Sequence, residues 1–101
     1  MDPERISDFN IADVVVSTAG RDKEGLFYVI GTDSEFLMLA NGKDRTLDKP
    51  KLKKRKHAKM VLRSETRVAE KLRRGDKVLN GELRRDLAFL AREMQGSNLG
   101  G

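Results

Sequence analysis

The chain contains no cysteine and no tryptophan, and it has only two prolines and one histidine among its 101 residues. Without cysteine, neither a disulfide framework nor a thiolate metal site can stabilise so small a fold, and nothing indicates an oxidising compartment. No apolar stretch approaches the roughly 20 residues of a membrane-spanning helix. The first residues, MDPERISDFN, are acidic and lack the features of a signal peptide. We therefore expect a cytoplasmic chain without membrane contact that is stabilised by packing alone.

Residue patterns that carry catalysis are also missing. The sequence has no phosphate-binding glycine loop, no nucleophile beside a base and no metal-ligand spacing. His57 is the single histidine, and no carboxylate or serine pattern accompanies it. Four acidic residues of the first half lie in or next to predicted turns, where carboxylates are ordinary: Asp33, Glu35, Asp44 and Asp48. We expect no catalytic residue, no metal and no cofactor, and therefore not an enzyme.

Positive charge is concentrated in one band of the sequence. Residues 1–48 hold five Lys/Arg against ten Asp/Glu, residues 49–63 hold eight against none, and residues 64–101 hold eight against six. The formal net charge of +5 therefore arises around the segment KPKLKKRKHAK, residues 49–59. A local field of this kind attracts an anionic polymer, of which nucleic acid is the commonest.

The first half of the chain has the pattern of a small β domain. Runs rich in Val, Ile, Leu, Phe, Tyr and Thr are separated by turn residues, which predicts strands at about 11–18, 26–31, 35–40 and 43–47. Asn41 and Gly42 lie between two of these runs, and this pair favours a type I′ hairpin turn. Four short strands in so small a segment tend to curl into a barrel that needs one more strand.

The basic segment is the only candidate for that fifth strand. Pro50 stands at its start, where a residue without an N–H is tolerated. Alternation then places Leu52 and Ala58 towards the core, on the side of Lys54 and Lys56. The predicted outward row is Lys51, Lys53, Arg55, His57 and Lys59. The alternative interpretations are a solvated linker between the barrel and the C-terminal helices, or a basic address signal.

Two short amphipathic helices are expected after the barrel. The first lies within 64–74, with Ser64 as the N-cap and Gly75 just beyond its end. The second lies within about 80–95, with one apolar face formed by Leu83, Leu87, Leu90 and Met94. This face either packs within the molecule or binds a partner protein, and Phe89 lies off it as a candidate for an exposed contact.

The segment DVVVSTAGRDKEGLFYVI resembles a KOW motif, and Gly20 matches its signature glycine. With ANGKDRTLDKPKLKKRKHA and AEKLRRGDKVLNGELRRDL, the resemblance extends over residues 11–90, to the small KOW-containing RNA-binding proteins of Gram-positive bacteria. These are relatives of KOW-type large-subunit ribosomal proteins of archaea and eukaryotes. One departure concerns the loop after Gly20, because Glu24 stands where such motifs have a glycine and Gly25 follows it.

The resemblance implies a five-stranded SH3-like barrel with two C-terminal helices, bound to ribosomal RNA or the large ribosomal subunit. The expected organisation is an N-terminal arm over 1–9, the barrel over 10–60, the helices over 61–95 and a flexible tail over 96–101. Turn positions are expected at Gly20, Gly25, Asn41 and Gly42. The residues expected to bind RNA come from the basic segment and the first barrel loop: Arg21, Lys23, Lys51, Lys53, Lys54, Arg55, Lys56, His57 and Lys59.

The residues also bear on the kind of RNA and on the main alternative function. Tyrosine, phenylalanine and tryptophan make up only 5% of the chain, so we expect recognition of folded RNA by shape and phosphate contacts rather than by a stacking platform. The alternative is a protein-interaction adaptor, since barrels of this size also bind polypeptides. It would use the barrel and the C-terminal helices.

Overall fold

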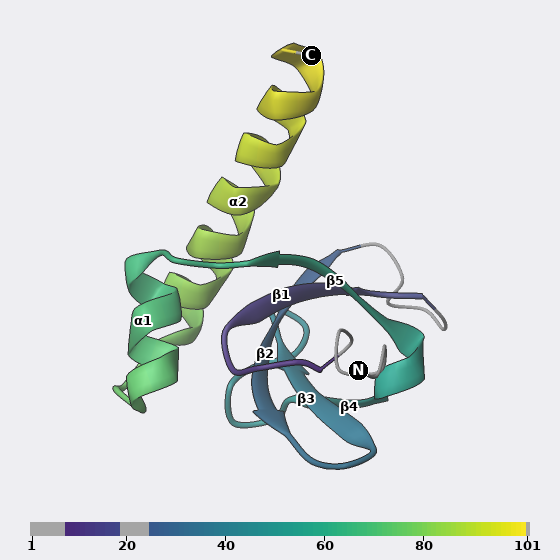
Figure 1. Cartoon of the computed structure of the whole chain (residues 1–101). Coiled ribbons are helices and arrows are strands. Elements are labelled where there is room, and N and C mark those ends of the chain that lie inside the picture. The colour runs from purple at the N-terminus through teal and green to yellow at the C-terminus, as the bar shows by residue number, and fades with distance from the viewer. Residues whose placement is uncertain (1–7, 19–24, 101) are drawn as a thin grey trace.

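The computed structural model describes residues 8–18 and 25–100, the last five of them by their backbone alone. Within this range the chain forms five strands, one 3₁₀ turn and two helices (Figure 1). In chain order they are β1 (Asp13–Ser17), β2 (Leu26–Thr32), β3 (Phe36–Ala40), β4 (Lys51–Lys54), η2 (Arg55–His57), β5 (Ala58–Arg63), α1 (Arg67–Arg74) and α2 (Asn80–Gly100). The prediction of a mostly β chain with two C-terminal helices is confirmed.

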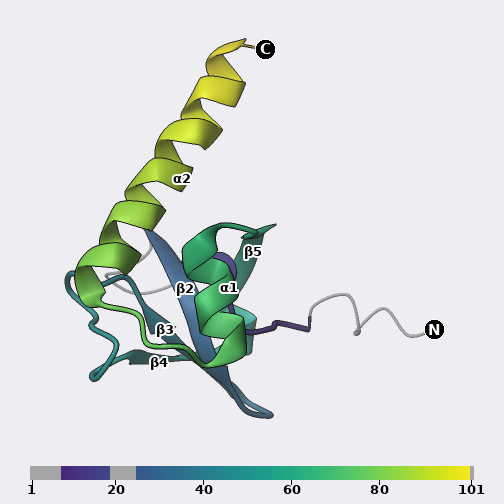
Figure 2. The ribbon, with the colours of Figure 1, turned by 90° about the vertical axis from the view of Figure 1, so that its left-hand side faces the viewer.

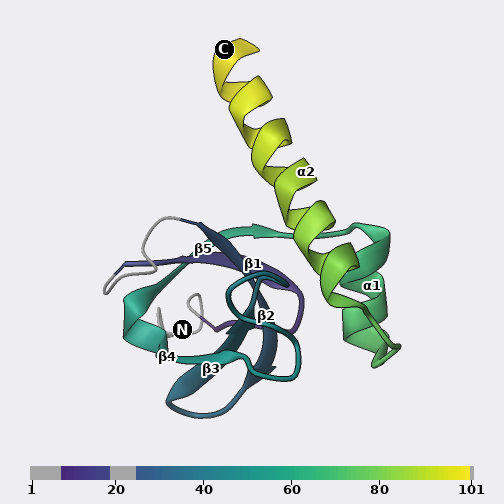
Figure 3. The ribbon, with the colours of Figure 1, turned by 180° about the vertical axis from the view of Figure 1, so that it is seen from behind.

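The five strands form one antiparallel sheet in the order β4-β3-β2-β1-β5. The first four strands follow one another as a meander, and η2 then reverses the chain so that β5 pairs with β1 (Figures 1 and 3). The sheet curls, but β4 and β5 stand at its two edges and are not paired with each other. The sheet is therefore five-stranded as expected, but it is not closed.

Both faces of the sheet are covered, because alternate residues of its strands point to opposite sides. One face carries an inner cluster formed by Phe9, Val15, Phe27, Val29, Leu37 and Leu39. The other face packs against the helices in an outer cluster formed by Ala12, Val14, Tyr28, Ala40, Ala69, Leu83, Leu87 and Leu90. Figure 2 shows α1 and the first turns of α2 on this second face, while the rest of α2 extends beyond the sheet. Leu83, Leu87 and Leu90 of the apolar face of α2 are thus packed within the molecule.

The predicted strand at 43–47 is wrong, as is the type I′ turn before it. Residues between β3 and β4 form a loop with a single bridge between Thr46 and Lys49. The side chain of Asn41 accepts from the backbone N–H groups of Lys43 and Arg45, at 2.9 and 3.0 Å. Gly42 has a φ of +79°, whereas Asn41 does not have the positive φ that a type I′ turn requires. An Asx turn at Asn41 therefore forms in place of the predicted strand pairing.

This loop is held by the start of α2. Leu47 donates its N–H to Oδ1 of Asn80 at 2.8 Å, and Arg84 donates to the carbonyl oxygen of Gly42 at 3.3 Å. Gly42 is buried, and a Cβ atom on it would lie 2.3 Å from the carbonyl oxygen of Asn80. The sequence pattern cannot reveal this contact, because Gly42 and Asn80 are far apart in the chain.

The helices match the prediction in their positions and differ at their ends. The N-cap of α1 is Thr66, whose Oγ1 accepts from the N–H of Ala69 at 3.1 Å, so the prediction of Ser64 is wrong. Gly75 ends α1 in a left-handed conformation with φ of +78°, as predicted. The backbone of α2 remains helical to Gly100, where a flexible tail was predicted from 96.

Ser64 belongs instead to a buried polar cluster centred on the hydroxyl of Tyr28. This hydroxyl donates to Oδ2 of Asp86 at 2.5 Å and lies 2.8 Å from Oγ of Ser64. Thr66 also donates to Oδ2 of Asp86, at 2.8 Å. The cluster therefore joins β2 to the segment before α1, to the N-cap of α1 and to α2. Burial and the hydrogen bond to Asp86 raise the pKa of Tyr28 to about 12.

The segment before β1 belongs to the core, so the predicted boundaries need correction. Phe9, placed in an N-terminal arm by the prediction, is 8% exposed and packs in the inner cluster. Asp13 is fully buried, and its carboxylate accepts from the N–H of Asn10 at 2.9 Å and from Nε of Arg63 at 3.3 Å. At the other boundary, β5 continues to Arg63, past the predicted end of the barrel at 60.

Gly42 and Gly75 form a matched pair for testing the loop contact with α2. Both have φ near +78°, but a Cβ on Gly75 meets nothing within 4 Å. Gly75→Ala should cost only the backbone strain, about 1–2 kcal/mol of unfolding free energy. Gly42→Ala adds a clash with Asn80 and should cost roughly 1–3 kcal/mol more. Urea denaturation of both variants checks this, and equal losses would contradict the close packing of loop and helix.

Tyr28 can be titrated directly, because it is the only tyrosine in the chain. Tyrosinate absorbance near 295 nm should show a midpoint at about 12 in the folded protein and near the ordinary tyrosine value of 10.0 in denaturant. The raised folded pKa means that the unfolded state loses its proton first, so stability is intact below about pH 10 and falls as pH rises towards 12. A folded-state midpoint at 10 would contradict the buried cluster.

Tyr28→Phe tests the same cluster at neutral pH. The variant leaves Asp86, Ser64 and Thr66 without the tyrosine hydroxyl and should lose about 1–3 kcal/mol of unfolding free energy. It should also lose the part of the alkaline destabilisation that comes from tyrosine ionisation. Urea denaturation at pH 7 and at pH 11 measures both effects, and an unchanged stability at pH 7 would show that the hydroxyl contributes nothing.

Candidate nucleic-acid interface

The basic segment 49–59 is ordered, but it is not one strand. It forms β4, the 3₁₀ turn η2 and the first residues of β5. The prediction of a single fifth strand is wrong, because the chain must cross from one edge of the sheet to the other and η2 makes this reversal between Lys54 and Ala58. The interpretation as a solvated linker is also wrong, since both flanking strands pair within the sheet.

The predicted alternation is reversed in β4. Leu52 is 61% exposed, whereas Lys53 is 9% exposed. The register explains this, because Lys53 lies opposite Leu37 and Lys51 opposite Leu39, both residues of the inner cluster. Residues directly opposite in an antiparallel pair share a face, and a lysine stem can cover apolar side chains. The direction of these side chains is therefore determined by the pairing of β4 with β3 and not by the hydrophobicity of the side chains themselves.

The exposed cations form a revised candidate surface. We use the name lysine edge for the four exposed lysines of this segment, which are Lys49, Lys54, Lys56 and Lys59. They belong to β4, to η2, to β5 and to the residue before Pro50. The row of Lys51, Lys53, Arg55 and Lys59 predicted from simple alternation does not exist as one strand surface.

Arg55 has a structural position within η2. Its Nε donates to the carbonyl oxygen of Asp33 at 3.0 Å. Its backbone N–H donates to the carbonyl oxygen of Glu35 at 3.1 Å. Its guanidinium lies 5.9 Å from the ring centre of Phe9, within the range of a cation–π contact. Backbone N–H groups of Phe36 and Glu35 lower the pKa of Asp33, with a further contribution from Arg55. Arg55 thus fixes η2 against the turn between β2 and β3.

A shallow hollow lies beside this turn. It has a volume of about 260 Å³ and is lined by Ser34, Glu35, Lys54, Arg55 and Lys56. Three cations and one carboxylate surround it. The lining therefore has a net positive charge, which favours an anionic group.

The remaining predicted residues divide into two groups. Gly20, Arg21 and Lys23 lie outside the described residues. His57 is half-buried in η2, and its carbonyl oxygen accepts from the N–H of Thr18 at 2.8 Å, which fixes the end of β1. Gly25 is exposed just before β2, with φ of +153°. The structure thus gives His57 a backbone contact with β1.

The sequence reasoning missed a second basic surface on the helices. Its exposed members are Arg67, Arg73, Arg74, Arg84, Arg85 and Arg92. Several of them are already engaged, since Arg74 pairs with Asp76 at 3.1 Å and Arg73 donates to the carbonyl oxygen of Ser64. The signal was present in the sequence, because these arginines lie off the apolar face of the helices. It was passed over because acidic residues nearby lower the net charge of the region.

The described residues contain neither a metal-ligand cluster nor a membrane-spanning helix. In this part of the chain, no group of three His, Asp or Glu side chains is placed to hold a metal ion. No helix within the same ranges is both long and apolar enough to cross a membrane. No protein-family model matches the chain, and no curated protein is significantly similar to it.

Proposed function

We propose that this chain is a non-catalytic RNA-binding protein that associates with ribosomal RNA, in the manner of the KOW-type proteins it resembles. The observation that carries the proposal is the lysine edge, in which four exposed lysines are held on an ordered, paired segment. Phosphate groups are the commonest partners of such a surface. Ordering matters, because side chains on an ordered backbone lose less conformational entropy when they bind a folded RNA than side chains on a solvated linker do.

We further propose that the sheet is an SH3-like barrel. A four-strand meander followed by a 3₁₀ turn, with the last strand returning beside the first, agrees with this fold. The curled sheet also encloses the inner cluster. The proposal extends to the first barrel loop with Arg21 and Lys23 as RNA contacts, to a cytoplasmic location and to association with the large ribosomal subunit.

The adaptor alternative has less support. An adaptor would use the apolar face of α2, but Leu83, Leu87 and Leu90 of this face are buried against the sheet. The exposed large apolar residues in the described part are Met38, Leu52, Leu79 and Phe89. Met38 and Leu52 are direct neighbours across β3 and β4, and the other two lie elsewhere. So small a surface favours a minor protein contact beside an RNA-binding face.

Filter binding to deproteinised large-subunit ribosomal RNA at several salt concentrations tests the proposal. If the lysine edge neutralises about four phosphates, the logarithm of affinity should fall against the logarithm of salt with a slope of about −3 to −4. Lys54→Ala/Lys56→Ala should weaken binding and reduce the slope by about 2. The matched control is Lys43→Ala/Lys77→Ala, which removes two exposed lysines outside the segment.

Equal effects of the two double variants would show that charge alone, and not the lysine edge, determines affinity. Absence of RNA binding at low salt, with a bound polypeptide that survives nuclease and salt, would favour the adaptor instead. Circular dichroism of each variant ensures that only folded proteins are compared.

A further inference from the structure

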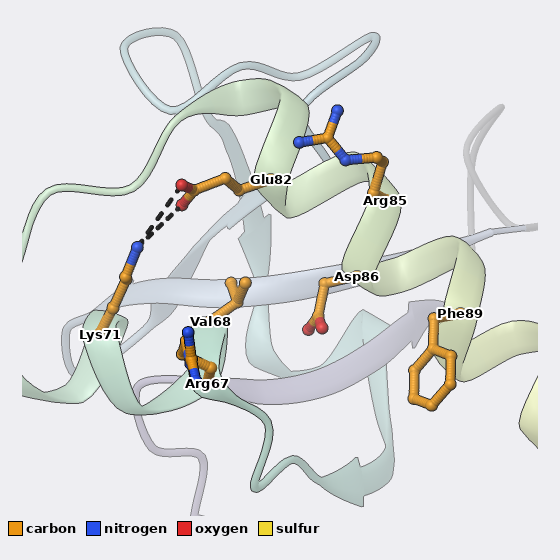
Figure 4. Close-up of a pocket in the computed structure, with 7 residues that line it drawn as sticks. All are labelled: Arg67, Val68, Lys71, Glu82, Arg85, Asp86 and Phe89. Carbon is orange, nitrogen blue, oxygen red and sulfur yellow. Dashed lines mark hydrogen bonds and ion pairs between the residues drawn. The ribbon is translucent and has the colours of Figure 1, made fainter.

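A groove between α1 and α2 has a composition that none of the preceding features explains. It has a volume of about 380 Å³ and is lined by Arg67, Val68, Lys71, Glu82, Arg85, Asp86 and Phe89. Lys71 and Glu82 form an ion pair at 3.4 Å across one end, and Phe89 lies at the other (Figure 4). The groove therefore has a polar end, which the ion pair crosses, and an aromatic end, which carries Phe89.

Phe89 is a large apolar side chain that belongs to neither hydrophobic cluster of the fold. It is 45% exposed, and it lies off the face of α2 that packs on the sheet. Its exposed ring can stack on a flat partner, and stacking on an aromatic side chain contributes about 1–3 kcal/mol for each base.

Two guanidinium groups border the groove, Arg67 from α1 and Arg85 from α2 (Figure 4). Both are exposed, and neither makes an ion pair or hydrogen bond in the part of the chain that the structure describes. Two exposed guanidinium groups that border one groove are suited to binding a phosphate group.

Asp86 also lines the groove and supplies a hydrogen-bond acceptor to it. One of its carboxylate oxygens accepts from Tyr28 and Thr66, and the described residues offer no donor to the other. Figure 4 shows the side chain directed into the groove. A carboxylate accepts hydrogen bonds but cannot donate them. It therefore favours a base with an amino group, as in cytosine, adenine or guanine, over uracil, whose N–H is flanked by two carbonyl oxygens.

We propose that this groove binds one unstacked nucleotide of RNA whose base carries an amino group. The base stacks on Phe89 and donates to Asp86, and its phosphate contacts Arg67 and Arg85. The inference rests on the proposed function, because it assigns a second contact to the same RNA. It also adds base selection to the lysine edge, since phosphate contacts position an RNA while base contacts select its sequence.

Nuclear magnetic resonance of the full chain with single nucleotides tests the groove separately from the lysine edge. CMP and UMP serve as probes and are titrated into labelled protein at millimolar concentration. CMP should shift the backbone amide signals of residues 67, 68, 85, 86 and 89, and UMP should shift them at least about fivefold more weakly. Shifts confined to β4 and η2, or equal responses to CMP and UMP, would overturn the inference.

Variants make the test sharper. Phe89→Ala should weaken CMP binding at least about fivefold, as expected from the loss of stacking. Leu79→Ala is the matched control, because Leu79 is 55% exposed and does not line the groove. Asp86→Asn keeps an oxygen for Tyr28 and offers an amide donor, so it should reverse the preference towards UMP. Unchanged binding by Phe89→Ala overturns the inference even if Asp86→Asn does not fold.

The two proposals fail in distinguishable ways. If ribosomal RNA binds with the predicted salt dependence but nucleotides leave the groove signals unchanged, the groove inference is wrong and the proposed function stands. If no RNA binds at low salt, the proposed function is wrong, and the groove loses its assigned role with it.

Discussion

The hydroxyl group of Tyr28 is the point through which the helices are placed on the sheet. Tyr28 lies on β2, the central strand of the sheet. Its hydroxyl group forms hydrogen bonds with Asp86 of α2 and with Ser64, which precedes α1. A buried hydroxyl without partners is costly, and Asp86 and Ser64 supply the partners here. The outer cluster supplies apolar contact with little directional preference, whereas this polar cluster accepts only one arrangement of the helices. The position of the groove between α1 and α2 depends on it, because Asp86 takes part in both.

The parts of the fold that follow from local pattern could be predicted from the sequence. The strands β1 and β2 have runs of β-branched and aromatic residues, β3 is a short apolar run, and α2 has an apolar face at helical spacing. Gly75 ends α1 because a left-handed C-cap favours glycine. In each case the information lies within a few residues of the element, so the prediction did not need tertiary contacts.

The parts that were wrong depend on contacts between distant residues. Alternation of hydrophobicity pointed Leu52 inward, but the register with β3 pointed Lys53 inward instead. Thr66 replaced Ser64 as the N-cap because Ser64 contacts Tyr28, 36 residues away along the chain. The loop after Asn41 is held by Asn80 and could not be inferred from a turn rule. Of the candidate site, the basic segment was found from composition, while the groove needed the packing of α1 on α2.

The inward direction of Lys53 has a consequence for the open edge of the sheet. β4 is an edge strand, and an edge with unpaired N–H and C=O groups can add a strand from another molecule. Lys51, Lys53 and Lys54 lie along this strand, and a second copy paired to it would bring like charges together at close range. Inward-pointing lysines, here Lys51 and Lys53, and an exposed charge such as Lys54 are both known means of discouraging such pairing. Lys54, which also belongs to the lysine edge, therefore helps to discourage pairing at the open edge of the sheet together with Lys51 and Lys53.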